Sequence, residues 1–185
     1  MTLALKFRWL TCIGIALFTL SVMGPALAQK IPLRSSVELT AFGGVQFKAP
    51  KWIVTGPKKP EVAVLRNDKM KGAGTPLLLM LSVEKGPSEL PDWNVIRQNI
   101  VNAARANDAS LKLSLKEDYT NLQGVTGKRM AGSLLEKEEI LSVELIALYK
   151  DGRLATVTLV RTPSDQQGQD LVGDIAASAV FNAKP

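Results

Sequence analysis

The sequence predicts an α+β fold in which helices sandwich one antiparallel β-sheet, an α/β/α arrangement. The main observation is the stretch 140–162, whose two apolar halves flank Lys150-Asp151-Gly152 as in a β-hairpin. Shorter segments with strand character precede this hairpin, and two amphipathic segments, near 91–105 and 164–181, have helical spacing. Consecutive strands with few helices are typical of an antiparallel sheet that helices cover.

Loop length decides the register of the hairpin, because each length sets different residues opposite one another. A two-residue turn would place Leu145 opposite Thr158 and would mix polarity on both faces. A three-residue loop, with Gly152 in the left-handed conformation, pairs Leu145 with Val157 and makes one face wholly apolar. We therefore expect the three-residue loop and a central position for both strands.

The first 28 residues have the three parts of a secretory signal peptide. Lys6 and Arg8 form the positive region, an apolar run extends from Trp9 to Met23, and Ala26-Leu27-Ala28 is a small-x-small cleavage site. This run is shorter than the roughly 20 apolar residues that a spanning helix needs. We therefore expect cleavage before Gln29 and a periplasmic or secreted protein that has no transmembrane segment.

Cleavage would leave 157 residues (185 minus 28), a length that suits a single domain with a sizeable core. Residues 29–41 lack clear periodicity, so we expect an extended N-terminal arm there. The single α+β domain is then expected to occupy residues 42–185.

Several short segments besides the hairpin have strand character, because they are rich in apolar residues and bounded by glycine, proline or charged residues. The run Leu77–Leu81 is apolar at every position, which indicates a central strand. The expected strands are 41–54, 61–66, 76–83, 111–116 and 124–135.

Two helices are expected, each with an apolar stripe that can pack on the sheet. The first begins near Pro91-Asp92, where proline and aspartate favour a first turn, and its stripe contains Trp93, Ile96 and Ile100. The second opens at Ser164, which has the spacing of a capping box with Gln167. Its stripe consists of Leu171, Val172, Ile175 and Ala179, and Phe181 follows against the core.

Histidine is absent from the chain, and the only cysteine, Cys12, lies in the signal peptide. The exported protein therefore lacks the residues of Ser-His-Asp and Cys-His catalytic sites, of Cys/His zinc sites and of most haem sites. We predict neither a cofactor nor a metal site.

Positive charge is concentrated in one short stretch of the exported chain. Residues 45–72 carry seven bases and two acids, a balance of +5, whereas the whole exported chain carries +4 (21 bases minus 17 acids). The candidate binding residues are Lys58, Lys59, Lys69 and Lys71, which flank the strand 61–66. They suit a protein partner or an anionic surface, either a membrane or a cell-wall polymer. The alternative interpretation is a solvated face without a partner.

Two other classes of function fit less well. Aromatic rings are scarce, which argues against a stacking platform for single-stranded nucleic acid. A glycosidase-like hydrolase could use a pair of carboxylates, and the candidates are Glu136, Glu138, Glu139 and Glu144, with Asp108, Glu117 and Asp118 elsewhere. The first three flank Lys137 at an expected turn, which is typical of a solvated connection, so we predict a protein that is not an enzyme.

Four segments together resemble the PsbP-like superfamily, which includes the photosystem II extrinsic subunit, the Ran-binding Mog protein and bacterial DcrB-like proteins. They are Phe47-Lys-Ala-Pro50-Lys-Trp52, a Gly-led strand after the first helix, a hairpin ending near Arg161-Thr-Pro163, and Ala177-Ser178-Ala179-Val180-Phe181. The match extends from about Phe42 to Phe181. The resemblance implies the α+β sandwich and a non-catalytic accessory or binding role, although functions differ widely among proteins that share a fold.

Overall fold

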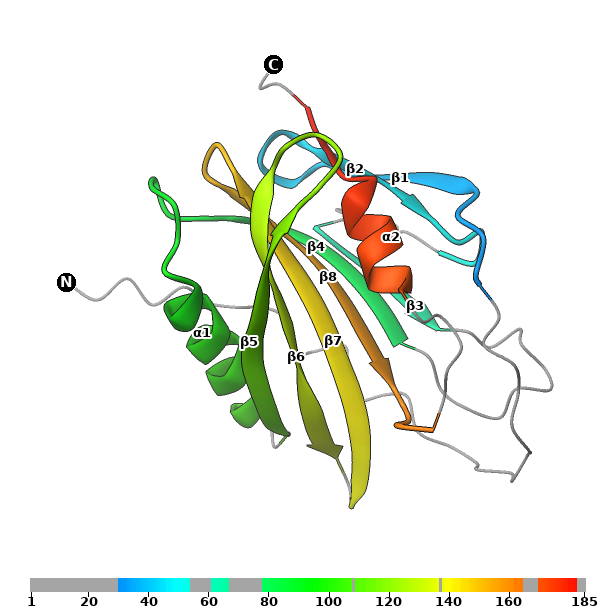
Figure 1. The fold of residues 1–185 in the computed structure, drawn as a ribbon, viewed down its shortest axis with the longest axis vertical. Coiled ribbons are helices and arrows are strands. Elements are labelled where there is room, and N and C mark those ends of the chain that lie inside the picture. Colours follow the sequence, from blue (N-terminus) through cyan, green and yellow to red (C-terminus); the bar gives the residue numbers. More distant parts are fainter. Residues whose placement is uncertain are drawn as a thin grey trace.

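The computed structural model describes residues 30–53, 61–66, 78–107, 109–136, 138–164 and 170–182 (Figure 1). Its largest element is a six-stranded antiparallel sheet with the order β3-β4-β8-β7-β6-β5. The strands are β3 (Val62–Arg66), β4 (Leu78–Lys85), β5 (Ser110–Thr120), β6 (Thr126–Glu136), β7 (Glu139–Lys150) and β8 (Arg153–Arg161). The predicted hairpin forms β7 and β8 in the middle of this sheet, so its central position is confirmed.

The predicted register of that hairpin is wrong by one residue. Lys150 pairs with Arg153 and Leu145 pairs with Thr158, so the turn has two residues. Asp151 (φ 50°) and Gly152 (φ 69°) are both left-handed, as in the turn whose twist matches that of the flanking strands. The prediction rejected this register because it mixes polar and apolar residues on both faces. The polar Thr156 is tolerated because its buried hydroxyl has a partner on another strand, Ser82 of β4, at 2.7 Å.

A second, three-stranded sheet with the order β1-β2-β9 lies over one face of the large sheet (Figure 1). It contains β1 (Ser35–Leu39), β2 (Val45–Ala49) and β9 (Val180–Phe181), and the 3-10 turn η2 (Ala41–Gly43) joins the first two. Part of the expected arm is therefore the strand β1. Its buried side chains Val37 and Leu39 belong to the core, although the surrounding sequence shows little periodicity.

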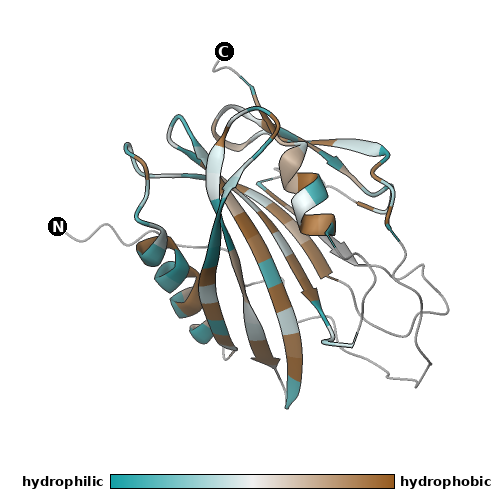
Figure 2. Cartoon of the chain, in the orientation of Figure 1, coloured by the Kyte–Doolittle hydropathy of each residue, from teal (hydrophilic) through white to brown (hydrophobic). Residues whose placement is uncertain are grey.

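Helix α1 (Trp93–Arg105) covers the other face of the large sheet. Its first turn is capped by Asp92, whose carboxylate accepts a 2.8 Å hydrogen bond from the backbone N–H of Asn94. Ile96 and Ile100 of the predicted stripe are buried. Figure 2 shows apolar residues along β7 and β8 and an alternation of polar and apolar residues around α1. The first predicted helix is thus confirmed together with its packing face.

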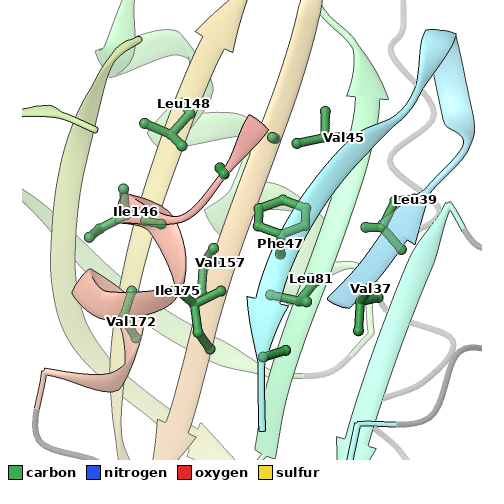
Figure 3. Close-up of a cluster of buried hydrophobic side chains, with 14 of the residues drawn as sticks. Val37, Leu39, Val45, Phe47, Leu81, Ile146, Leu148, Val157, Val172 and Ile175 are labelled. Atoms are coloured by element: carbon green, nitrogen blue, oxygen red, sulfur yellow. The ribbon is translucent and has the colours of Figure 1, made fainter. Parts of the chain in front are cut away.

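Helix α2 (Leu171–Ala177) packs beside the small sheet on the same face of the large sheet (Figure 3). Its buried residues Val172 and Ile175 meet Phe47 of the small sheet and Val157 of the large one in a single apolar cluster. The buried stripe is as predicted, but the start of the helix is not. Asp170 has a φ of 64°, so this helix begins after it rather than at Ser164. Gln167 lies outside the described residues.

The predicted α+β class, an antiparallel sheet covered on both faces, is confirmed, and the small sheet is an addition to it. One face carries α1, and the opposite face carries α2 together with the β1-β2-β9 sheet. Within the part of the chain that the structure describes, neither helix is long and apolar enough to cross a membrane.

Candidate functional site

The four lysines predicted to bind a partner, Lys58, Lys59, Lys69 and Lys71, lie outside the described residues. The strand that they flank is present as β3. Lys51, a base of the stretch 45–72, is described, and it lies with Lys30 and Arg34 at the end of the small sheet where β1 begins and β2 ends. The candidate site is built from these residues.

A surface pocket of about 280 Å³ lies at this end of the small sheet, and we call it the Trp52 pocket. One wall is the segment that leads into β1, and the other is the turn that follows β2. A backbone hydrogen bond from Arg34 N to Ala49 O at 3.0 Å holds the two walls together, and one from Ile53 N to Pro50 O at 3.1 Å closes the turn after β2. The residues that line the pocket are Lys30, Ile31, Pro32, Arg34, Pro50, Lys51 and Trp52.

The charge of the Trp52 pocket is positive. Lys30, Arg34 and Lys51 are exposed, and no acid is among the described residues that line the pocket. Asp174 of α2 lies nearby and forms an ion pair with Lys30 at 3.4 Å, but 80% of the Lys30 side chain remains exposed. An exposed ion pair of this kind contributes little stability, so the lysine remains available to an anionic partner.

The other four residues that line the Trp52 pocket are apolar. Trp52 is half-buried and packs against the core cluster on its inner side. Ile31 is buried, and the rings of Pro32 and Pro50 complete the lining. The pocket therefore combines exposed cations with an indole that is anchored in the core, which can receive a ligand that is anionic and partly apolar.

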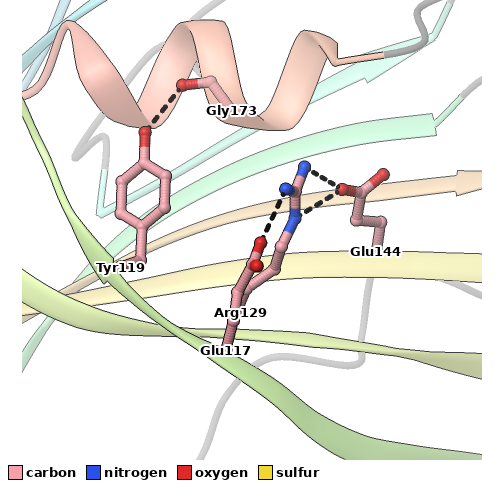
Figure 4. Close-up of polar contacts among 5 residues, drawn as sticks. All are labelled: Glu117, Tyr119, Arg129, Glu144 and Gly173. Carbon is pink, nitrogen blue, oxygen red and sulfur yellow. Dashed lines mark hydrogen bonds and ion pairs between the residues drawn. The ribbon is translucent and has the colours of Figure 1, made fainter.

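A second polar cluster lies under α2 and joins three strands of the large sheet (Figure 4). Arg129 of β6 donates to Glu144 of β7 from Nε at 2.9 Å and from Nη2 at 2.6 Å. Its Nη1 donates to Glu117 of β5 at 3.1 Å. Burial lowers the pKa of Arg129, but the hydrogen bonds with Glu117 and Glu144 outweigh this effect and leave the pKa raised. The cluster thus holds a permanent cation between two carboxylates.

The Arg129 cluster contains two of the carboxylates that the sequence offers as catalytic candidates. It brings Glu117 and Glu144 together, but both carboxylates already accept hydrogen bonds from the guanidinium of Arg129. Such an arrangement is suited to linking neighbouring strands. Asp118 instead pairs with Lys128 at 2.9 Å. Asp108 and the side chain of Glu136 lie outside the described residues. Glu138 lies in the turn between β6 and β7, and Glu139 is the first residue of β7. Among described side chains, no group of three or more potential metal ligands occurs.

Tyr119 of β5 fastens α2 to the sheet, because its hydroxyl donates to the carbonyl oxygen of Gly173 at 2.9 Å (Figure 4). Burial raises the pKa of Tyr119 above 10.0, Arg129 opposes the rise, and Asp174 adds to it. A raised pKa in the folded state means that the neutral phenol stabilises the fold. This contribution is fully present below the unfolded pKa and is lost as the pH rises through the folded pKa.

We therefore expect Tyr119→Phe to flatten the alkaline loss of stability. Phenylalanine cannot ionise, so the free energy of unfolding should fall less steeply above about pH 10 in the variant than in the parent protein. Urea melts at pH 7 and at a series of pH values above 10 measure this difference. Parallel curves for the two proteins over the whole range would contradict it.

At the opposite end of the small sheet, Arg153 is buried with 2% of its surface exposed. Its Nη1 donates to the carbonyl oxygens of Gly44 at 3.2 Å and Asn182 at 2.6 Å, and its guanidinium lies 5.4 Å from the ring centre of Phe181. A shallow pocket of about 520 Å³ adjoins it, lined in part by the half-exposed ring of Phe42. Arg153 ties the hairpin to the small sheet, and the sequence alone does not single it out.

The arrangement of two sheets and two helices can be compared with known proteins. The solution structure of the cyanobacterial PsbP protein (CyanoP) from Synechocystis has a TM-score of 0.58 and 16% identity to this chain. The match covers 85% of this chain and 99% of that one. The chain has the PsbP-like fold. The resemblance seen in the sequence is therefore confirmed for the fold.

Two further matches to solved structures are more distant. A protein of unknown function from Pseudomonas aeruginosa has a TM-score of 0.44 and 12% identity, covering 70% of this chain and 85% of that one. A protein from Bacteroides thetaiotaomicron has a TM-score of 0.46 and 13% identity, covering 75% of this chain and 45% of that one. No family model and no curated protein match the sequence.

Proposed function

We propose that this PsbP-like protein is an exported, non-catalytic accessory or binding protein that contacts an anionic surface. The observation that carries the proposal is the charge of the Trp52 pocket, where Lys30, Arg34 and Lys51 lie together and no described lining residue is acidic. The same region of the sequence continues into the stretch 45–72, with its balance of +5. A concentrated positive surface attracts anionic partners and holds them by interactions that salt weakens.

The lysines predicted from the sequence extend this surface in the proposal. Lys58, Lys59, Lys69 and Lys71 flank β3, a strand at the edge of the large sheet. Bases in connections between strands can meet a partner without being needed by the core. The partner is then a membrane surface, a cell-wall polymer or an acidic protein, and export places the protein where such partners occur.

Reversing two of these charges tests the proposal. We expect Lys58→Glu with Lys59→Glu to abolish retention on anionic vesicles or on a polyanion column at low salt, because each base near an acidic surface contributes about 1 kcal/mol. The midpoint of thermal unfolding should stay nearly unchanged.

The matched control is Lys112→Glu with Lys116→Glu, which makes the same change in net charge at two exposed positions of β5. This control should be retained almost as well as the parent protein. If both double variants lose retention equally, net charge alone explains binding. If neither loses retention, the basic stretch is a solvated face without a partner.

A further inference from the structure

The Trp52 pocket combines two features that an anionic polymer does not require together. Its lining contains three exposed cations together with an indole, two proline rings and an isoleucine. A purely hydrophilic polyanion would gain from the cations alone, because the apolar lining residues would give it no favourable burial. The pair of features therefore selects a partner that is both anionic and apolar.

We propose that the Trp52 pocket is a docking site for an anionic lipid bilayer, with the indole of Trp52 at the interface between headgroups and acyl chains. The inference rests on the proposed function and deepens it by naming the partner. Tryptophan favours the membrane interface because its ring is apolar while its N–H can still donate a hydrogen bond. Lys30, Arg34 and Lys51 then face the lipid phosphates, with their aliphatic stems along the apolar boundary.

The way Trp52 is held supports this assignment. Its inner side packs against the core cluster, and the turn that carries it is closed by the hydrogen bond from Ile53 N to Pro50 O. The indole is therefore positioned before any partner binds, so little conformational entropy is lost on docking.

Tryptophan fluorescence can report on this site alone. The chain has three tryptophans, and Trp9 is removed with the predicted signal peptide, so Trp93→Phe leaves Trp52 as the single reporter in the exported protein. The exported protein carrying this change is titrated with vesicles of equal parts phosphatidylglycerol and phosphatidylcholine. We expect a blue shift of the emission and quenching by brominated acyl chains. Pure phosphatidylcholine vesicles, inorganic phosphate and polyglutamate are expected to produce neither effect.

Two charge variants of the reporter protein test the role of the cations. Arg34→Gln with Lys51→Gln should weaken partitioning into the anionic vesicles about tenfold or more, because each base contributes about fivefold near such a surface. The control Lys112→Gln with Lys116→Gln removes the same charge from β5 and should leave partitioning within about twofold of the reporter protein, since exposed charges beyond a Debye length are screened.

The outcomes separate this inference from the proposed function. Co-sedimentation with anionic vesicles without a shift or quenching of Trp52 would overturn the docking site while leaving surface binding intact. A shift produced by phosphate or polyglutamate alone would also overturn it, because the pocket would then hold a soluble anion or an acidic chain. Failure to bind vesicles and polyanions alike would overturn both proposals.

Discussion

Replacing Gly132 by alanine is expected to destabilise the protein by about 3 kcal/mol or more, because the added methyl group would clash with backbone atoms and no side-chain rotation can relieve the clash. Gly132 lies in β6 between Leu113 of β5 and Val143 of β7. An added methyl group would collide with the carbonyl oxygen of Lys112 and would lie 3.0 Å from the Cα of Leu113. Backbone atoms of a central ladder cannot move aside without breaking its hydrogen bonds.

The matched control is Gly173→Ala in α2. There the new methyl group would meet only the guanidinium of Arg129, at an ordinary distance of 3.7 Å. Alanine is also the better helix former by about 1 kcal/mol, so this variant should be as stable as the parent or slightly more stable. Urea denaturation followed by circular dichroism compares the two. Equal midpoints for both variants would show that β5 and β6 are not packed as closely as described.

The second large effect is expected at Arg153. Arg153→Ala removes the donor shared by the carbonyl oxygens of Gly44 and Asn182, as well as the cation above Phe181. Loss of a buried, charged donor with two acceptors should cost about 3 kcal/mol. The damage should be greatest where β2 pairs with β9, so amide hydrogen exchange at Val45 and Phe181 should accelerate.

Lys150 provides the control, because it is the cross-strand partner of Arg153 but is exposed. Lys150→Ala should change stability by no more than about 0.5 kcal/mol. Arg153→Lys should recover only part of the loss, because one ammonium group lacks the planar fork of donors. If Arg153→Ala matches Lys150→Ala in urea melts, Arg153 does not tie the hairpin to the small sheet.

The elements with a strong local pattern were predictable. Helix α1 has its cap at Asp92 and its stripe at Ile96 and Ile100, and these signals lie within one short segment. The strands of the large sheet were also found, because their apolar residues alternate or run together. Local patterns therefore sufficed for the class of the fold and for its main sheet.

The candidate site was only partly predictable. The sequence indicated a basic region, and Lys51 and Trp52 fall within it, but Lys30 and Arg34 lie in the segment expected to be an arm. They reach the pocket because β1 pairs with β2, which sets Ser35 opposite Ala49. A strand of five residues is too short to show a clear period, and its own sequence does not tell which strand it pairs with. No local signal could therefore have brought together the two walls of the Trp52 pocket.

By itself, the sequence determined much of the chemistry that the chain can offer, since it holds no histidine and its single cysteine is Cys12. It also determined the α+β class, because amphipathic periods are local. Only the tertiary structure decided the hairpin register, because the hydroxyl that looked misplaced at Thr156 is satisfied by Ser82 from another strand. It likewise decided the burial of Arg153, whose acceptors Gly44 and Asn182 are distant in the chain. A buried polar group is stable only with its partner in place, and that partner is chosen by the fold.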